Sequence, residues 1–260
     1  MIIHRIARIA TVIATLGSSL PSFAVSISLD FATLPSAQGW RYLTFTKSNE
    51  ADVFSIDGFA LHQNSIGTFD EPRYFWQGVV PHSAFDLRFR ARLAEVEGLF
   101  QGNFSFGVKL RADNFWIDVG LGLGRVEVQE NSRRSEYFSL DTSEFHNYRV
   151  LGNPEAGSYS FFIDEIELIS SRSIGHTSVN INFLSFGDHI SAFNGFPMGA
   201  RADLASFTFA PIPEPTIIWL FLSGLGLLIA QYARPTIKEL KYTFKEAKRG
   251  QRGKEGPGSI

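Results

Sequence analysis

The sequence of 260 residues contains no cysteine and only two methionines. The absence of cysteine excludes disulfide crosslinks, thiol nucleophiles and thiolate metal sites. The sequence also has no Gly-x-Ser-x-Gly motif, no phosphate-binding loop and no His-x-x-x-His spacing. These absences argue against the hydrolase, nucleotide-binding and metalloenzyme classes that such motifs typify. The six histidines are scattered, so no metal site and no cofactor is expected.

Long helical periodicity is missing outside two apolar segments, one near each end. At the N-terminus, Arg5 and Arg8 precede an apolar stretch that ends at the small residues Ser22 and Ala24. This order is typical of a secretory signal peptide at residues 1–24, cleaved after Ala24. An uncleaved membrane anchor is the alternative, but the apolar stretch is short for crossing a bilayer.

The second apolar segment, residues 216–233, is 18 residues long and carries no charge. That length is just sufficient to span the hydrocarbon of a membrane. The residues that follow, 234–260, contain eight basic and three acidic side chains. Because basic flanks stay in the cytoplasm, residues 235–260 are predicted to be a cytoplasmic tail, and the domain before the helix is predicted to lie outside.

A Pro-Glu-Pro motif directly precedes this segment, at Pro213, Glu214 and Pro215. Together with the single membrane helix and the basic end, residues 211–234 resemble the PEP-CTERM sorting domain of Gram-negative bacteria. The resemblance implies processing by exosortase, a membrane cysteine transpeptidase, and an association with exopolysaccharide. The protein would be held in the inner membrane with its domain outside, and then released to the cell surface or extracellular matrix.

This sequence departs from the family in one respect, because 26 residues follow Arg234. The family usually ends within a few residues of its first basic cluster. A permanently anchored surface protein, not processed by exosortase, is therefore the alternative reading of the C-terminal region.

The charge between the two apolar segments is strongly acidic. Residues 25–212 hold 14 Lys and Arg against 22 Asp and Glu, a net charge of −8. Nucleic-acid-binding domains present a basic surface, so this balance argues against a nucleic-acid partner.

The same region, with a domain expected at 25–210, is predicted to be all-β. Apolar and polar residues alternate without a break from Phe85 to Leu93. This period-two pattern is typical of a strand with one buried face and one solvent-exposed face. Further strands are predicted at 104–111, 116–123, 125–130, 147–151, 158–163, 167–170 and 202–209. Turns are expected at 112–114, 152–154 and 157. Many short strands with regular turns favour a sandwich or a barrel.

The order of segments 145–150, 159–164 and 181–188 resembles the concanavalin A-like, or laminin G-like, jelly-roll sandwich. The resemblance implies an antiparallel jelly-roll β-sandwich. The hairpin Asp-Gly of that family is Asp164-Glu165 here. Because a tight two-residue turn favours glycine, a longer or differently shaped turn is expected at this point.

Catalysis is not expected. Glucanases of this fold resemble one another in an E-x-D-x-x-E strand, which places paired carboxylates on one face for retaining hydrolysis. The nearest segment, Asp164-Glu165-Ile166-Glu167, has the wrong spacing and is read as a charged turn. A glycoside hydrolase or lyase on the same fold remains the alternative to a non-catalytic protein.

Glycan binding or a structural role in exopolysaccharide is the preferred functional reading. Aromatic side chains stack on sugars and arginines bind anionic groups, so five residues are candidate glycan contacts: Tyr74, Trp76, Arg88, Arg90 and Arg92. The competing interpretation is that the aromatics belong to the core and the arginines to a solvated strand face. Asp188 and Asp203 flank a loop at 187–199, which leaves a calcium ion as a further alternative.

Overall fold

The computed structural model describes residues 26–44, 48–67, 72–78, 84–97, 106–112, 115–130, 134–174, 182–189, 199–212 and 224–225. The predicted signal peptide with Ser22 and Ala24, the Pro213–Pro215 motif and the basic tail lie outside these residues. The chain divides after Ile212 into two units. Within the second unit, Gly224 and Leu225 are helical and exposed. Among the described residues, no helix has the length and apolar character needed to cross a membrane.

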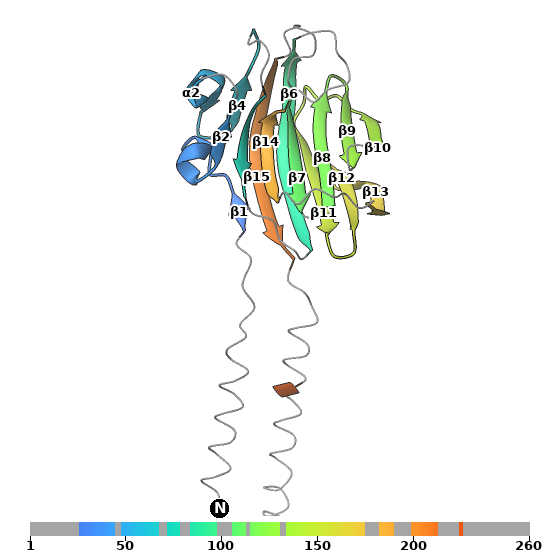
Figure 1. Cartoon of the computed structure of the whole chain (residues 1–260). Coiled ribbons are helices and arrows are strands. Elements are labelled where there is room, and N and C mark those ends of the chain that lie inside the picture. The colour runs from blue at the N-terminus through green and yellow to red at the C-terminus, as the bar shows by residue number, and fades with distance from the viewer. Residues whose placement is uncertain are drawn as a thin grey trace, which may run out of the picture. The chain divides into compact units, whose positions relative to one another are not determined.

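The first unit contains two antiparallel sheets (Figure 1). The eight-stranded sheet runs in the order β13 (Ile166–Ser173), β12 (Ser158–Ile163), β11 (His146–Asn153), β6 (Phe85–Val96), β15 (Ala200–Pro211), β4 (Leu61–Asn64) and β3 (Phe54–Ile56), with β1 (Ile27–Ser28) pairing with β15. The seven-stranded sheet runs in the order β10 (Arg134–Ser139), β9 (Arg125–Glu130), β8 (Phe115–Gly122), β7 (Phe106–Ala112), β14 (Phe183–Asp188), β5 (Arg73–Gln77) and β2 (Arg41–Leu43). Two short helices, η1 (Pro35–Gln38) and α2 (Glu50–Val53), lie between the early strands.

Aromatic side chains from both sheets fill the space between them. Phe85 of β6 and Phe115 of β8 meet edge to face with ring centroids 5.6 Å apart. Phe54 of β3 and Phe75 of β5 have ring centroids 4.7 Å apart. Because each pair joins one sheet to the other, the inward faces of both sheets form one continuous core. The expected all-β, antiparallel sandwich is therefore confirmed.

The alternation predicted for Phe85–Leu93 is confirmed in detail. Phe85, Leu87, Phe89, Ala91 and Leu93 are buried, whereas the side chains between them face outward. Strands 125–130 and 158–163 have the predicted bounds. The expected strand end at Leu123 is wrong, because Leu123 lies in the β8–β9 turn and is exposed.

Two turn predictions are also corrected. The turn expected at 152–154 begins later, because Gly152 and Asn153 continue β11 and pair with β12. The β12–β13 hairpin is a tight two-residue turn, since Ile163 pairs directly with Ile166. Asp164 and Glu165 both adopt positive φ, 48° and 65°, as the central residues of a type I′ turn do. The left-handed backbone was thus achieved here without glycine.

Candidate functional site

The outer face of the seven-stranded sheet carries a cluster of aromatic and charged side chains. Strand alternation turns Lys109 and Arg111 away from the core, while their neighbours Val108 and Leu110 are buried within it. The register of the sheet then sets side chains from neighbouring strands beside them. We call this set the outer-face cluster: Tyr74, Trp76, Lys109, Arg111, Trp116, Asp118, Phe183, Ser185 and His189.

Arg111 is the centre of one row across this cluster. Its register partners are Trp116 on β8 and Phe183 on β14. The guanidinium carbon lies 3.5 Å from the ring centroid of Trp116 and 5.2 Å from that of Phe183. Trp76 continues the row, with its ring centroid 6.5 Å from Phe183. Cation–π contacts of this kind hold a guanidinium in place without using its hydrogen-bond donors.

Asp118 is the buried acid of the cluster, with only 1% of its surface exposed. It accepts a hydrogen bond from the indole Nε1 of Trp116 at 2.7 Å, and the Nζ atom of Lys109 lies 3.6 Å from its other carboxylate oxygen. Burial raises the pKa of Asp118, while Lys109, Arg111 and the Trp116 hydrogen bond oppose that rise. Burial likewise lowers the pKa of the Arg111 guanidinium, and the charge of Asp118 works against this.

Three polar atoms of the cluster are buried without a hydrogen-bond partner in the described part of the chain. They are Nε of Arg111, Oγ of Ser185 and Nε2 of His189. Burial lowers the pKa of His189 well below its usual value, and the charges of Lys109 and Arg111 add to the effect. The imidazole is therefore neutral near pH 7. Unsatisfied buried polar groups are costly, so each of these three atoms calls for a hydrogen-bond partner.

A row of glycines crosses the sheet beside these groups. Gly187, Gly107 and Gly120 are successive register partners on β14, β7 and β8, between Tyr74 and Glu127. At Gly187 the φ angle is +124°, and a Cβ atom would lie 2.9 Å from the carbonyl oxygen of Arg73. Because glycine has no side chain, the backbone is uncovered along this row of three strands. Such a row allows a flat group to approach the sheet closely.

The five candidate glycan contacts do not form one site. Tyr74 and Trp76 belong to the outer-face cluster, whereas the three arginines of β6 face outward from the opposite sheet. Arg88 pairs with Asp86 at 2.8 Å, and Arg90 lies over the ring of Phe145 at 4.8 Å. The arginine stripe is thus a set of paired side chains on a sheet surface, and the whole core separates it from Trp76.

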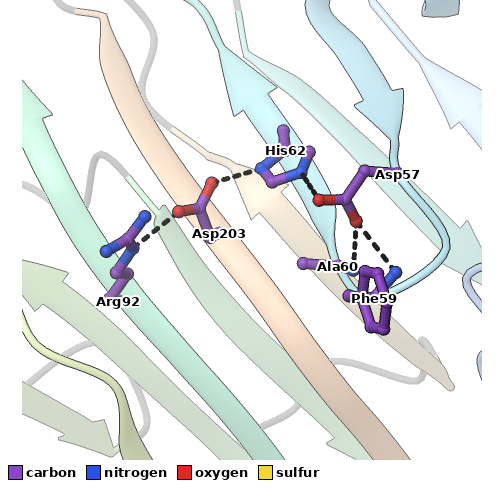
Figure 2. A network of polar contacts seen from close by, with 6 residues as sticks. All are labelled: Asp57, Phe59, Ala60, His62, Arg92 and Asp203. Atoms are coloured by element: carbon purple, nitrogen blue, oxygen red, sulfur yellow. Dashed lines mark hydrogen bonds and ion pairs between the residues drawn. The ribbon is translucent and has the colours of Figure 1, made fainter.

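Arg92 belongs to a polar network on that opposite face (Figure 2). Asp203 of β15 accepts a hydrogen bond from Nε of Arg92 at 2.6 Å and contacts Nδ1 of His62 at 2.7 Å. The other imidazole nitrogen of His62 lies 3.2 Å from Asp57. Burial lowers the pKa of His62, but the hydrogen bonds with Asp203 and Asp57 outweigh it, so that the pKa is raised.

The two aspartates considered for calcium lie in different environments. Asp203 is engaged by Arg92 and His62, whereas Asp188 is buried on β14 and accepts a hydrogen bond from Ser65 at 2.8 Å. Within the described ranges, no three His, Asp or Glu side chains are grouped so that they could hold a metal ion. Most of the loop between the two aspartates lies outside those ranges.

The Asp164–Glu167 segment, weighed above as a carboxylate motif, is the β12–β13 turn. Asp164 accepts hydrogen bonds from the backbone N–H of Asn147 at 2.9 Å and contacts Nδ1 of His146 at 2.6 Å. It borders an open groove of about 380 Å³ whose other lining residues are largely apolar, Tyr137, Ile166 and Leu168 among them. Asp164 thus stabilises the hairpin, and the segment presents no pair of carboxylates in a cleft.

Sequence reasoning missed Lys109, Arg111, Trp116 and Asp118. The signal for them was present, because both strands had been recognised and these residues occupy the alternate, non-core positions. What the sequence does not contain is the register that pairs Lys109 with Asp118 and Arg111 with Trp116. Only the folded sheet brings the four together.

Comparisons with known proteins identify the fold but no family. No protein-family model matches the chain, and no curated protein matches its sequence. Among solved structures, a sialidase matches 73% of this chain and 19% of its own with a TM-score of 0.53 at 9% identity. A Bacillus licheniformis β-glucanase matches 72% of this chain and 98% of its own, with a TM-score of 0.47 at 10% identity. The likeness to the sialidase, at 9% identity, concerns the fold alone.

Proposed function

We propose that this chain is an exported, non-catalytic saccharide-binding protein whose outer-face cluster contacts the sugar. The observation that carries the proposal is the row formed by Trp76, Phe183, Arg111 and Trp116 across four neighbouring strands. Half-buried aromatic faces with a few fixed polar groups among them are typical of small-ligand sites. Sugar rings offer C–H faces to such aromatics and hydroxyl groups to the polar atoms.

The test is binding of the full chain, purified in mild detergent, to an array of polysaccharides that includes the producing bacterium's own. Trp76→Ala is expected to weaken binding at least tenfold, since aromatic anchors dominate such sites. Arg90→Gln, on the opposite sheet, is the matched control and should change binding less than twofold. Absence of binding across the array, or equal loss in both variants, would refute the proposal.

Export and sorting form the second part of the proposal. The signal peptide at 1–24 is removed, and exosortase processes the chain at the Pro213–Pro215 motif and delivers it to the surface or matrix, where exopolysaccharide is its partner. The sequence pattern of both ends supports this. Intact mass spectrometry of membrane and extracellular fractions tests it. A mature chain that lacks both ends supports sorting, whereas retention of the helix and basic tail means a permanently anchored protein.

Glycoside hydrolysis is the second candidate, favoured by one observation. Asp118 and Glu127 are both buried carboxylates on the outer face of adjacent strands. Hydrolysis by two carboxylates requires about 5–9 Å between them and a bound sugar in the gap. Release of reducing ends that disappears in both Asp118→Asn and Glu127→Gln would make the protein an enzyme. Binding without product release supports the non-catalytic reading.

A further inference from the structure

We propose that the outer-face cluster selects an acidic saccharide, whose carboxylate or sulfate group binds beside Arg111 and Lys109. This inference rests on the proposed function and specifies its ligand class. It follows from the charges of the cluster, from its unpartnered polar atoms and from the protonation state of one histidine.

The first argument is a local imbalance of charge. Lys109 and Arg111 both stand on the outer face of β7, and Asp118 is the one acidic residue of the cluster. Asp118 contacts Lys109, but Arg111 contacts the rings of Trp116 and Phe183. A partly buried cation is stable when an anion pairs with it. Within the described residues Arg111 has no carboxylate in ion-pair contact, so an acidic ligand would supply one.

The second argument is the geometry of the donors. The Nε atom of Arg111 is buried and unpartnered, as is the hydroxyl of Ser185. Ser185 is the register partner of Lys109, so its hydroxyl lies on the same side of the sheet as the lysine. Stacking on Trp116 fixes the plane of the guanidinium, and a planar guanidinium binds carboxylate and sulfate oxygens through charge-assisted hydrogen bonds.

The third argument explains why the ligand would be an acidic sugar and not an inorganic anion. His189 forms a hydrogen bond with the backbone of Gly107, and this bond favours the protonated imidazole. The imidazole ring is therefore the donor of the bond. The unpartnered atom is Nε2, and in the neutral ring it must be the acceptor. An acceptor repels an anion but accepts a hydrogen bond from a hydroxyl group. The cluster therefore offers donors for an acid group and an acceptor for a sugar hydroxyl.

The fourth argument is contrast with the remainder of the domain. Residues 25–212 carry a net charge of −8, which repels polyanions at long range. The outer face of the seven-stranded sheet also presents two further basic residues, Arg41 and Arg125. Besides Asp118, this face presents the acidic residue Glu127. A basic face on an acidic domain orients an acidic polymer toward that face.

The experiment measures affinity of the full chain for polygalacturonate, a sulfated polysaccharide and a neutral β-glucan, at low and at moderate salt. The acidic polymers are expected to bind at least tenfold tighter than the glucan at low salt, and the difference should shrink as salt rises. Arg111→Gln should weaken acidic binding about tenfold and should weaken glucan binding by a clearly smaller factor. Lys109→Gln is a second variant in case Arg111→Gln is unstable, and Arg88→Gln on the opposite sheet is the control.

The outcomes distinguish the two proposals. Equal affinity for neutral and acidic polymers, with Trp76→Ala still weakening both, overturns the acidic preference and leaves saccharide binding intact. Acidic binding that Arg88→Gln weakens as much as Arg111→Gln also overturns it. No binding to any polymer overturns both proposals. A carboxylate preference over sulfate, or the reverse, identifies the acid group.

Discussion

The ring of Trp116 lies against the guanidinium of Arg111, 3.5 Å from ring centroid to guanidinium carbon, while the indole N–H of the same tryptophan donates to Asp118. One side chain thus positions both the cation and the acid of the outer-face cluster.

Trp116→Phe is expected to separate these two roles. An aromatic ring remains beside Arg111, but Asp118 loses its 2.7 Å hydrogen bond. Depriving a buried carboxylate of a donor costs about 1–2 kcal/mol of the free energy of unfolding. Urea denaturation measures the loss. Trp76→Phe is the control, and a loss as large in that variant would show that ring size, and not the N–H group, matters.

Two adjacent phenylalanines of β12 test the assignment of its faces. Phe161 is 0% exposed and points into the core, whereas Phe162 points outward beside Arg149. Phe161→Ala should lower the free energy of unfolding by about 3–5 kcal/mol through the cavity it leaves. Phe162→Ala should lower it by less than about 1 kcal/mol. Chemical denaturation of both variants decides the matter, and similar losses would mean that the strand register is wrong.

The β12–β13 hairpin is expected to gain stability from glycine. Glu165 holds φ at 65°, which is costly for a residue with a Cβ atom. Glu165→Gly should therefore raise the free energy of unfolding by about 0.5 kcal/mol, after the greater entropy of glycine in the unfolded chain is counted. Asp164→Gly should lower it, because the side chain of Asp164 caps Asn147 and contacts His146. Thermal unfolding compares the two, and destabilisation by Glu165→Gly would contradict the strain argument.

His62 should make stability depend on pH. Its pKa is raised above the ordinary 6.5 by Asp203 and Asp57, so its protonated form is favoured in the folded protein. The stabilisation is fully present below the unfolded pKa and is lost as pH rises through the folded pKa. The melting temperature of the native chain should exceed that of His62→Gln at pH 5.5 and approach it at pH 9. A difference that grows with pH would reverse the sign and refute the assignment.

The sequence predicted the fold well where a strand has one buried face and one solvent-exposed face. In β6 each inward residue is apolar and most outward ones are charged, so both the strand and its faces could be read. The early strands β2, β3 and β4 were missed, because each is only three or four residues long and too short for a clear alternation. The tight turn at Asp164-Glu165 was missed because its residues do not show the expected glycine signal.

The candidate site could be predicted only in part. Trp76 was recognised from the aromatic residues around it, and the Arg88–Arg92 stripe was named as a separate candidate. The sequence did not show that the two lie on opposite sheets. A period-two pattern tells which residues share a face of one strand. It carries no information on which sheet the strand joins, since that depends on pairings between distant segments.

The last strand of the domain, β15, occupies a central place in its sheet, between β6 and β4, and also pairs with β1. It brings Phe207 and Phe209 into the core. A chain that ends at residue 199 therefore lacks the strand that joins the two halves of the eight-stranded sheet. Folding of this sheet must await the last 12 residues of the domain, so a chain truncated before β15 is expected to stay unfolded.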